Sequence, residues 1–238
     1  PYLQFEHLAD LGARYHRMIH QYFLGIDPDR LFEGLMDEKF KIWWQNFLVF
    51  AQEQFDIEDE SEMVIQPEKV LAVGIGKHTL IAKYDLLCIS GGKIQIYDWK
   101  TTQKRPNRPW LAARMQTLLY PYICFQSASE GLIPGSIAED LEMTYWFANY
   151  PDLPEKFRYD KNKFQVDAAS LAEMIALIER LEEDEFALTD DIKKCRYCVY
   201  RSYCDRGETA DEIQDYIDTG EIGVVGNSDN WVIDTELV

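Results

Sequence analysis

The chain has 238 residues, of which 47% are hydrophobic and 13% aromatic, so it can fill one substantial core and is not a wholly disordered protein. It contains no run of about 18 uncharged apolar residues and no basic, apolar leader, and we expect a soluble, unsecreted protein. The formal net charge of −18 argues against a nucleic-acid partner, because phosphate binding usually requires a basic surface. About half of that excess lies in residues 205–238, which hold ten acidic residues against one basic residue, Arg206.

The first half of the chain changes from helical to strand-like patterning. Apolar residues at helical spacing predict helices over residues 6–24 and 37–55, with a connection over 25–34 between them. After acidic residues 56–62, four strands are expected, over residues 63–66, 69–73, 79–89 and 93–100. The last two strands flank Ser90-Gly91-Gly92, which is typical of a tight hairpin turn.

The second half mixes helices with two further strands. A basic, proline-rich segment over residues 104–109 introduces a long predicted helix that ends near residue 126. Strands are expected over residues 142–148 and 156–166, and an amphipathic helix over 168–185. The fold class that follows is α/β, with an acidic tail after the last cysteine.

The hairpin predicts a cluster of charges. If Gly91 and Gly92 are the two central turn residues, Asp85 lies opposite Asp98, and Lys83 lies opposite Lys100. Opposed Cβ atoms are about 4.5 to 5.5 Å apart, so the two carboxylates would repel one another without a cation between them. Asp98 and Lys100 share one face of the strand. An exposed, ion-paired end of the hairpin is the alternative, and the pattern alone leaves both open.

Several of these residues together resemble the RecB-type branch of the PD-(D/E)XK nucleases, over Gly12 to Cys204. The motifs that carry the resemblance are Tyr84-Asp85, the run Tyr97-Asp98-Trp99-Lys100-Thr101-Thr102, and Gln116 with Tyr120 as Q-x-x-x-Y. The resemblance implies a restriction-endonuclease-like core, with a mixed central sheet flanked by helices and a C-terminal cysteine staple. The implied domains are a nuclease domain (1–204), with a helical part (about 1–60), a catalytic core (about 61–190) and the staple (191–204), and an acidic tail (205–238).

The resemblance also assigns an active site. The implied ligands of a Mg²⁺ or Mn²⁺ ion are His16, Asp85, Asp98 and the backbone carbonyl of Trp99. His16 is chosen by its G-x-x-x-H motif, and His20, one turn further on, could be confused with it. Carboxylate oxygens are suitable ligands for Mg²⁺, and a site with one imidazole ligand can also bind Mn²⁺. Lys100 matches the lysine beside the attacking water, where it would stabilise the transition state.

Substrate contacts are expected on two elements. By the resemblance, Gln116 and Tyr120 contact the substrate strand; their spacing of four places them on one helix face, although packing alone could explain the pair. The basic residues that follow the D-x-K motif offer a local positive track on an acidic protein. Those expected to bind DNA are Lys104, Arg105 and Arg114.

The five cysteines fall into two groups. Cys88 and Cys124 stand alone in apolar segments and are expected to be small buried side chains. Cys195, Cys198 and Cys204 lie within ten residues and suit a metal better than a disulfide framework. They resemble part of the iron–sulfur staple of RecB-type nucleases, which implies a [4Fe–4S] cluster whose fourth ligand is not visible in this chain. Zn²⁺ is the alternative occupant.

The expected function is a metal-dependent DNA exonuclease acting on single strands or ends, in DNA repair, recombination or CRISPR adaptation. The alternative is a catalytically idle DNA-binding or scaffolding module of the same fold. We expect a cytoplasmic protein of a prokaryote or phage, with no membrane partner. The acidic tail is expected to bind protein partners or to compete with DNA for the basic residues.

Overall fold

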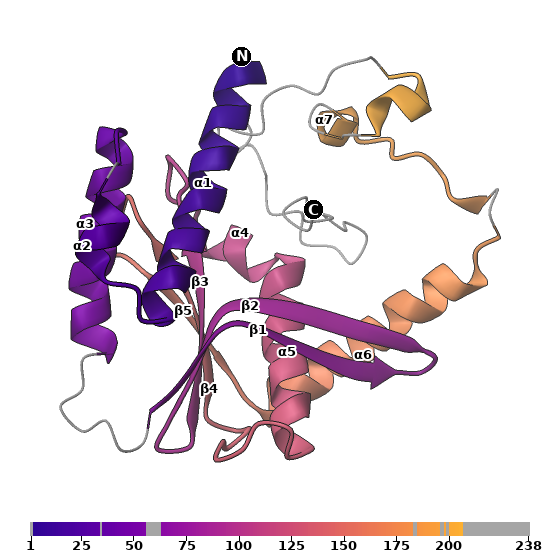
Figure 1. The fold of residues 1–238 in the computed structure, drawn as a ribbon. Coiled ribbons are helices and arrows are strands. Elements are labelled where there is room, and N and C mark those ends of the chain that lie inside the picture. Colours follow the sequence, from indigo (N-terminus) through magenta and orange to yellow (C-terminus); the bar gives the residue numbers. More distant parts are fainter. Residues whose placement is uncertain are drawn as a thin grey trace.

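The computed structural model describes residues 2–33, 35–55, 63–182, 185–195, 198 and 200–206. Within this part, helices and one mixed sheet follow one another along the chain (Figure 1). The helices are α1 (Tyr2–Phe23), α2 (Pro28–Phe32), α3 (Glu38–Phe55), α4 (Arg108–Ala112), α5 (Met115–Ser129), α6 (Lys161–Arg180) and α7 (Ile192–Cys195), followed by the 3-10 helix η2 (Arg201–Cys204). None of the described helices is both long and apolar enough to cross a membrane.

The sheet has five strands in the order β1-β2-β3-β4-β5. They are β1 (Val64–Ile75), β2 (His78–Ser90), β3 (Lys93–Lys100), β4 (Leu141–Phe147) and β5 (Glu155–Tyr159). Only β3 and β4 pair in parallel, and α4 and α5 form the crossover that a parallel pair requires. The other neighbours are antiparallel. This mixed sheet flanked by helices confirms the predicted α/β, restriction-endonuclease-like fold.

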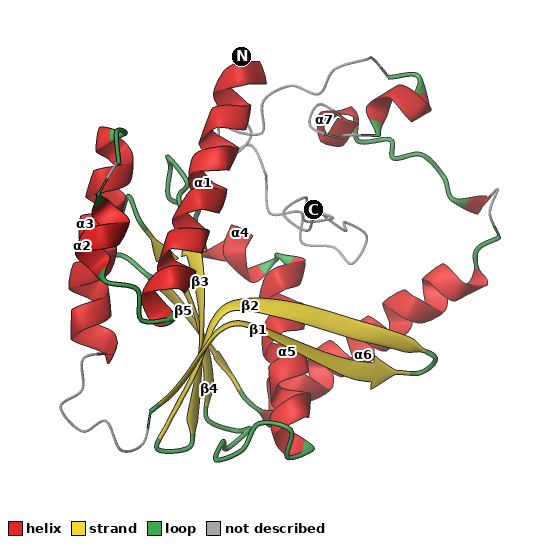
Figure 2. Cartoon of the chain, in the orientation of Figure 1, coloured by secondary structure: helices red, strands yellow, loops and turns green. Residues whose placement is uncertain are grey.

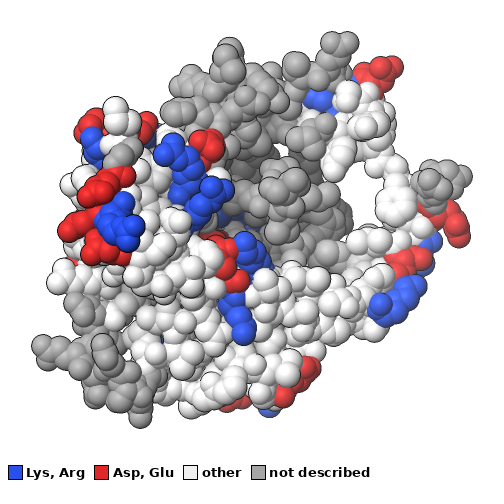
Figure 3. Space-filling view, viewed as in Figure 1, with Lys and Arg blue, Asp and Glu red and all other residues white. Residues whose placement is uncertain are grey.

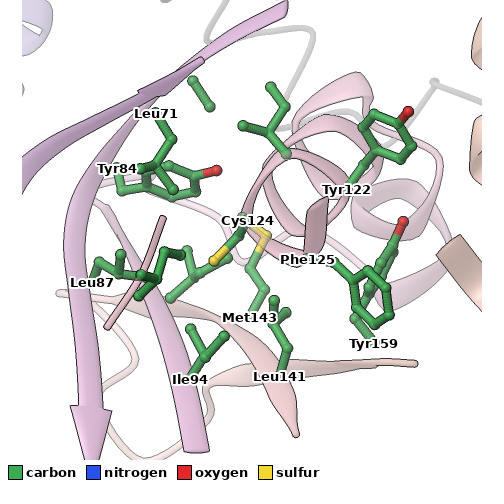
Figure 4. Close-up of a cluster of buried hydrophobic side chains, with 14 of the residues drawn as sticks. Leu71, Tyr84, Leu87, Ile94, Tyr122, Cys124, Phe125, Leu141, Met143 and Tyr159 are labelled. Carbon is green, nitrogen blue, oxygen red and sulfur yellow. The ribbon is translucent and has the colours of Figure 1, made fainter. Parts of the chain in front are cut away.

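Helices cover both faces of the sheet and form two cores (Figure 2). On one face, α1 and α3 pack an aromatic-rich core against alternate sheet residues such as Trp99 and Trp146. On the other face, α5 and α6 pack on the intervening residues, and Figure 4 shows Cys124 of α5 lying next to Met143 of β4. The alternation of the strands therefore divides their side chains between two hydrophobic layers. Cys88 and Cys124 are both buried, as predicted.

The β2–β3 hairpin has the predicted turn and register. Gly91 and Gly92 have φ angles of 55° and 86°, which a two-residue turn needs and glycine supplies readily. Strand pairing runs from the turn as far as Leu86 opposite Tyr97. Beyond that pair, β2 leaves β3 and continues with β1 as a two-stranded arm (Figure 1).

Because of this divergence, the expected pair of Asp85 and Asp98 lies just beyond the last paired residues of the hairpin, and the expected pairing of Lys83 with Lys100 is wrong. Lys83 lies on the arm, opposite Val70 of β1, and its ammonium forms an ion pair with Glu68. Its side chain is 60% exposed, whereas that of Lys100 is buried. The two lysines therefore occupy different environments, and only Lys100 lies at the charge cluster.

Two predicted elements are divided differently in the structure. The helix expected over residues 109–126 is two helices, because Arg114 is extended (ψ 142°) between α4 and α5. The hydroxyl of Thr117 donates to the carbonyl of Leu111 at 2.5 Å, which satisfies an acceptor at the end of α4. Conversely, the strands expected over 63–66 and 69–73 form one strand, β1, which continues through Glu68 at a φ of 53°.

The strand expected over residues 156–166 ends at Tyr159, and α6 begins at Lys161 rather than near residue 168. Asp160 causes this early start, because its carboxylate accepts a hydrogen bond from the backbone N–H of Lys163 at 2.8 Å. Aspartate is among the preferred N-cap residues of helices. The apolar alternation of this segment therefore belongs partly to a helix.

Asp160→Ala should destabilise the protein by about 1 kcal/mol, the usual contribution of an aspartate N-cap. Urea unfolding followed by circular dichroism measures this change. Asp152→Ala, which removes an exposed carboxylate from the preceding loop, is the matched control and should change stability much less. Equal stabilities of the two variants would show that the cap does not hold the start of α6.

Candidate active site

The charged cluster lies where β2 separates from β3. The carboxylate of Asp85 accepts a hydrogen bond from the backbone N–H of Trp99 at 2.8 Å. A side chain thus provides the acceptor at the place where strand pairing has ended. On the other side of β2, Glu68 of β1 lies at the same level as Asp85 and has its positive φ there. Both strands of the arm therefore change their geometry at Asp85.

Helix α1 brings a histidine to this carboxylate. A Cβ atom on Gly12 would lie 3.2 Å from Oγ1 of Thr101, so the helix packs very closely against the end of β3. One turn further along α1, Nδ1 of His16 lies 3.2 Å from Oδ1 of Asp85. The side chain of His16 is 32% exposed and that of Asp85 18% exposed. Solvent and ligands can therefore reach this pair.

Asp98 and Lys100 form a buried ion pair. Nζ of Lys100 lies 3.0 Å from Oδ2 of Asp98, and the two side chains are only 6% and 4% exposed. The side-chain amide of Gln116, on α5, donates to Oδ1 of the same aspartate. Buried charges are costly unless they are paired and hydrogen-bonded. The hydrogen bond from Gln116 to Asp98 joins β3 to the beginning of α5.

A tyrosine that the sequence did not reveal supports this arrangement. Tyr145 of β4 lies opposite Asp98 in the parallel register. Its hydroxyl is 2.7 Å from Oγ1 of Thr117 and 3.4 Å from Oε1 of Gln116. Its ring centroid is 5.8 Å from Nζ of Lys100. The contact depends on the β3–β4 pairing across a long crossover, and no local sequence pattern signals it.

Tyr120 lies beside the same cluster through a contact with the arm. The hydroxyl of Tyr84 donates to the backbone carbonyl of Tyr120 at 2.9 Å, and the two ring centroids are 5.0 Å apart. Burial and the nearby charge of Asp98 raise the pKa of Tyr120 above its usual range, so this phenol stays protonated. Gln116 and Tyr120 thus both lie at the cluster from one face of α5.

The electrostatics of the cluster pair positive with negative groups. Burial by itself would lower the pKa of His16, but the Asp85 carboxylate reverses this effect and raises the pKa to about 9. Burial would raise the pKa of Asp85, but the imidazolium of His16 and the N–H of Trp99 hold it below its usual value. In the metal-free protein, His16 and Lys100 therefore neutralise the two carboxylates.

The donor set suits a divalent cation. Asp85 and Asp98 offer hard carboxylate oxygens and His16 offers an imidazole, which are ligand types that Mg²⁺ and Mn²⁺ accept. Within the described ranges, no three His, Cys, Asp or Glu side chains are grouped closely enough to hold a metal ion. Asp98 instead faces Lys100 and Gln116.

The basic segment after the D-x-K motif is largely tied to the protein itself. Arg105 and Arg108 both form ion pairs with Glu155 of β5. Arg114 packs over the ring of Trp110 at 4.7 Å, and Lys104 is exposed. The arginines expected to bind substrate therefore have structural partners on β5 and α4.

The three clustered cysteines lie in and around α7 and η2. The sulfur of Cys195 is buried and accepts a hydrogen bond from Arg206 at 3.0 Å. Cys198 and Cys204 are partly exposed, and all three are free thiols. Among the described residues, these three sulfurs are not close enough together to bind one metal ion. The acidic tail from residue 207 onwards lies outside the described residues, as do residues 56–62.

A hairpin that carries a buried D-x-K pair, on a mixed sheet between two helical layers, defines a protein of the restriction-endonuclease-like class. The comparison with family models agrees, since the model of the PD-(D/E)XK nuclease superfamily matches residues 3–205. The chain belongs to this superfamily. Its fold and its membership together make it a nuclease-type protein, whose superfamily acts on nucleic acid with divalent metals such as Mg²⁺ or Mn²⁺.

Other comparisons add little. Among solved structures, the crystal structure of SSO0001 is 15% identical, with a TM-score of 0.35, and the match covers 69% of this chain and 68% of that chain. This likeness is too weak to carry an argument. No curated protein matches the sequence.

The His16–Asp85 pair should make stability pH-dependent in metal-free protein. The contribution of His16 is complete below its ordinary pKa of 6.5 and is lost as the pH rises through about 9. The contribution of Asp85, whose pKa is lowered from 3.8, is present above that pH and is lost on acidification. In EDTA, the wild-type urea midpoint should therefore fall between pH 6.5 and 9 relative to that of His16→Gln.

His20→Gln, which removes a histidine one turn further on, is the control and should retain the pH dependence of the wild type. If the wild type and His16→Gln lose stability in parallel over this range, the pair does not exist in solution.

Proposed function

We propose that the protein is a Mg²⁺- or Mn²⁺-dependent DNA nuclease that degrades single strands or strand ends, and that it serves DNA repair, recombination or CRISPR adaptation. The observation that carries the proposal is the buried Asp98–Lys100 pair, held by Gln116 and adjacent to Asp85 and His16. A PD-(D/E)XK protein needs this combination for phosphodiester hydrolysis. The exonuclease mode and the pathway rest on the resemblance of the motifs.

In this proposal, His16, Asp85, Asp98 and the backbone carbonyl of Trp99 hold the cation. When bound, the cation would polarise the scissile phosphate and lower the pKa of a bound water. Lys100 stabilises the negative charge that develops on the phosphate in the transition state. Its burial strengthens this interaction, because the local dielectric constant is lower than in bulk water.

Helix α5 positions the ligands and the substrate. Gln116 fixes the orientation of Asp98 through its amide, and Tyr145 in turn contacts Gln116. Tyr120 presents a neutral phenol beside the same cluster, where it can donate a hydrogen bond to a phosphate oxygen. These residues are positioning groups, whereas Asp98 and Lys100 act on the reacting atoms.

A catalytically idle module of the same fold is a poorer explanation of this geometry. Replacing a buried ion pair by packed apolar residues is often neutral or stabilising, by about 1 to 4 kcal/mol. A protein that only bound nucleic acid would gain nothing from keeping Asp98 and Lys100 buried at the end of an apolar strand. Turnover gives both residues a reason to be there.

Asp98→Asn and Lys100→Ala should each reduce cleavage of end-labelled DNA by a factor on the order of 10² to 10³ or more, because each removes a charge that acts in the transition state. Single-stranded and double-stranded substrates are compared in Mg²⁺, in Mn²⁺ and in EDTA. Circular dichroism checks the fold of each variant. EDTA should abolish cleavage by the wild type.

Lys83→Ala is the matched control, because Lys83 is the exposed lysine of the same hairpin. It should cleave like the wild type. Full activity of purified Asp98→Asn would remove the site from the mechanism, and binding without cleavage by the wild type in both metals would favour the idle module.

We also propose that Cys195, Cys198 and Cys204 contribute three ligands to a [4Fe–4S] cluster, with Zn²⁺ as the competing occupant. The support is their spacing and the cationic Arg206, which donates a hydrogen bond to the sulfur of Cys195. The cluster has no role in the hydrolytic step.

Anaerobically purified protein should contain iron and inorganic sulfide and absorb in the visible range. Cys198→Ser should lower the metal content, whereas Cys88→Ser, which removes a buried and isolated thiol, should not. Stoichiometric zinc without iron in anaerobic protein would contradict the cluster.

A further inference from the structure

Helix α1 as a whole has two acidic residues and two arginines, but the part from Asp10 to Phe23 carries an excess of positive charge in an acidic protein. Between Asp10 and Phe23 it contains one acidic residue and two arginines, Arg14 and Arg17, while the whole chain has a net charge of −18. Both arginine side chains are exposed. In the space-filling view, Lys and Arg side chains gather over the middle of α1 (Figure 3).

These arginines differ from the other basic residues near the site. Arg105 and Arg108 share an ion pair with Glu155, and Lys83 forms one with Glu68. Within the part of the chain that the structure describes, Arg14 and Arg17 form no ion pair. Arg14 rests over the ring of Phe40 at 5.7 Å, so its stem is supported while its charge remains exposed.

The position of the two arginines relative to the cluster is fixed by the helix. His16, which contacts Asp85, lies between them in the sequence, and residues three apart on a helix are neighbours on its surface. The close approach of Gly12 to Thr101 holds this part of α1 against the end of β3. The arginines therefore lie within one turn of His16 on the helix that borders the cluster opposite α5, on the exposed sides of that helix rather than on the face that carries His16.

The two helices that border the cluster belong to opposite faces of the sheet. Helix α1 packs in one core and α5 in the other. Asp85 contacts His16 of α1, and Asp98 contacts Gln116 of α5. A phosphodiester that reached both carboxylates would have Gln116 and Tyr120 on one side and α1 on the other. The next phosphates along the strand would then pass over the exposed arginines.

We infer that Arg14 and Arg17 are positioning residues that bind the backbone phosphates of the nucleic-acid strand on the α1 side of the scissile bond. This inference rests on the proposed nuclease function. Guanidinium groups suit the role, because they are always charged and can bind a phosphate with two parallel hydrogen bonds. The nucleic-acid strand thus crosses the end of the sheet from α5 to α1, and the segment of residues 104–109 is not its main cationic contact.

The test measures binding of a labelled single-stranded oligonucleotide to full-length protein in the cleavage-deficient Asp98→Asn background, over a range of salt concentrations. Arg14→Gln with Arg17→Gln should weaken binding at low salt on the order of tenfold or more. It should also reduce the slope of log affinity against log salt by roughly 0.7 to 0.9 for each phosphate that the variant no longer binds. Arg17→Gln alone, which removes one of the two exposed guanidinium groups, should give about half of this change in slope.

Two control variants separate charge from structure. Arg180→Gln removes the same charge from an exposed position at the end of α6 and should leave the affinity close to that of the background protein. Arg14→Lys with Arg17→Lys should retain most of the salt dependence, because the charges remain. In the otherwise wild-type enzyme, the double glutamine variant should raise KM more than it lowers kcat.

The outcomes distinguish the inference from the proposed function. If the wild type cleaves DNA and the double glutamine variant binds no worse than Arg180→Gln, the inference is overturned and the nuclease function stands. A loss of affinity in the lysine variant equal to that in the glutamine variant would also overturn it, since packing would then be the cause. If the wild type neither cleaves nor binds nucleic acid, the proposed function itself fails.

Discussion

The hydrogen bond from the Trp99 backbone to the Asp85 carboxylate is the contact on which the site depends. It is formed where β2 stops pairing with β3, so a side chain provides the acceptor at the point of divergence. Without the divergence, Asp85 would be one more residue of a continuous ladder. Because β2 diverges, the carboxylate of Asp85 lies at the end of β3, where His16 of α1 contacts it.

Each layer of the fold contributes side chains to the charged cluster. The sheet supplies the carboxylates and Lys100, α1 supplies the imidazole, and α5 supplies Gln116. The two hydrophobic cores hold these layers at fixed positions, and the buried tyrosines, Tyr84 and Tyr145, join α5 to the strands on either side of β3. The charges are therefore oriented by packed elements rather than by loops, which favours precise geometry.

Local patterns in the sequence were sufficient for the hairpin and for the strand that carries Asp98 and Lys100. Turn glycines and side-chain alternation are properties of neighbouring residues, and they fixed the register as far as Leu86. The separation of β2 from β3, the contact of Tyr145 and the binding of Arg105 by Glu155 all depend on residues far apart in the chain. No periodicity reports such contacts. The roles of His16 and Gln116 came from resemblance, and only the fold places them near the carboxylates.

The glycine turn of the β2–β3 hairpin restricts where insertions and deletions can occur in this protein. Side chains alternate between the two cores along β3, so an insertion or deletion of one residue between Gly92 and Asp98 would exchange the faces of Asp98 and Trp99. A carboxylate would then enter the aromatic core, and an indole would replace it in the site. The turn is also held from outside, because the backbone carbonyl of Gly92 accepts a hydrogen bond from Ile137 at 2.7 Å. Variation in length should therefore be tolerated at the tip of the β1–β2 arm and not at this turn.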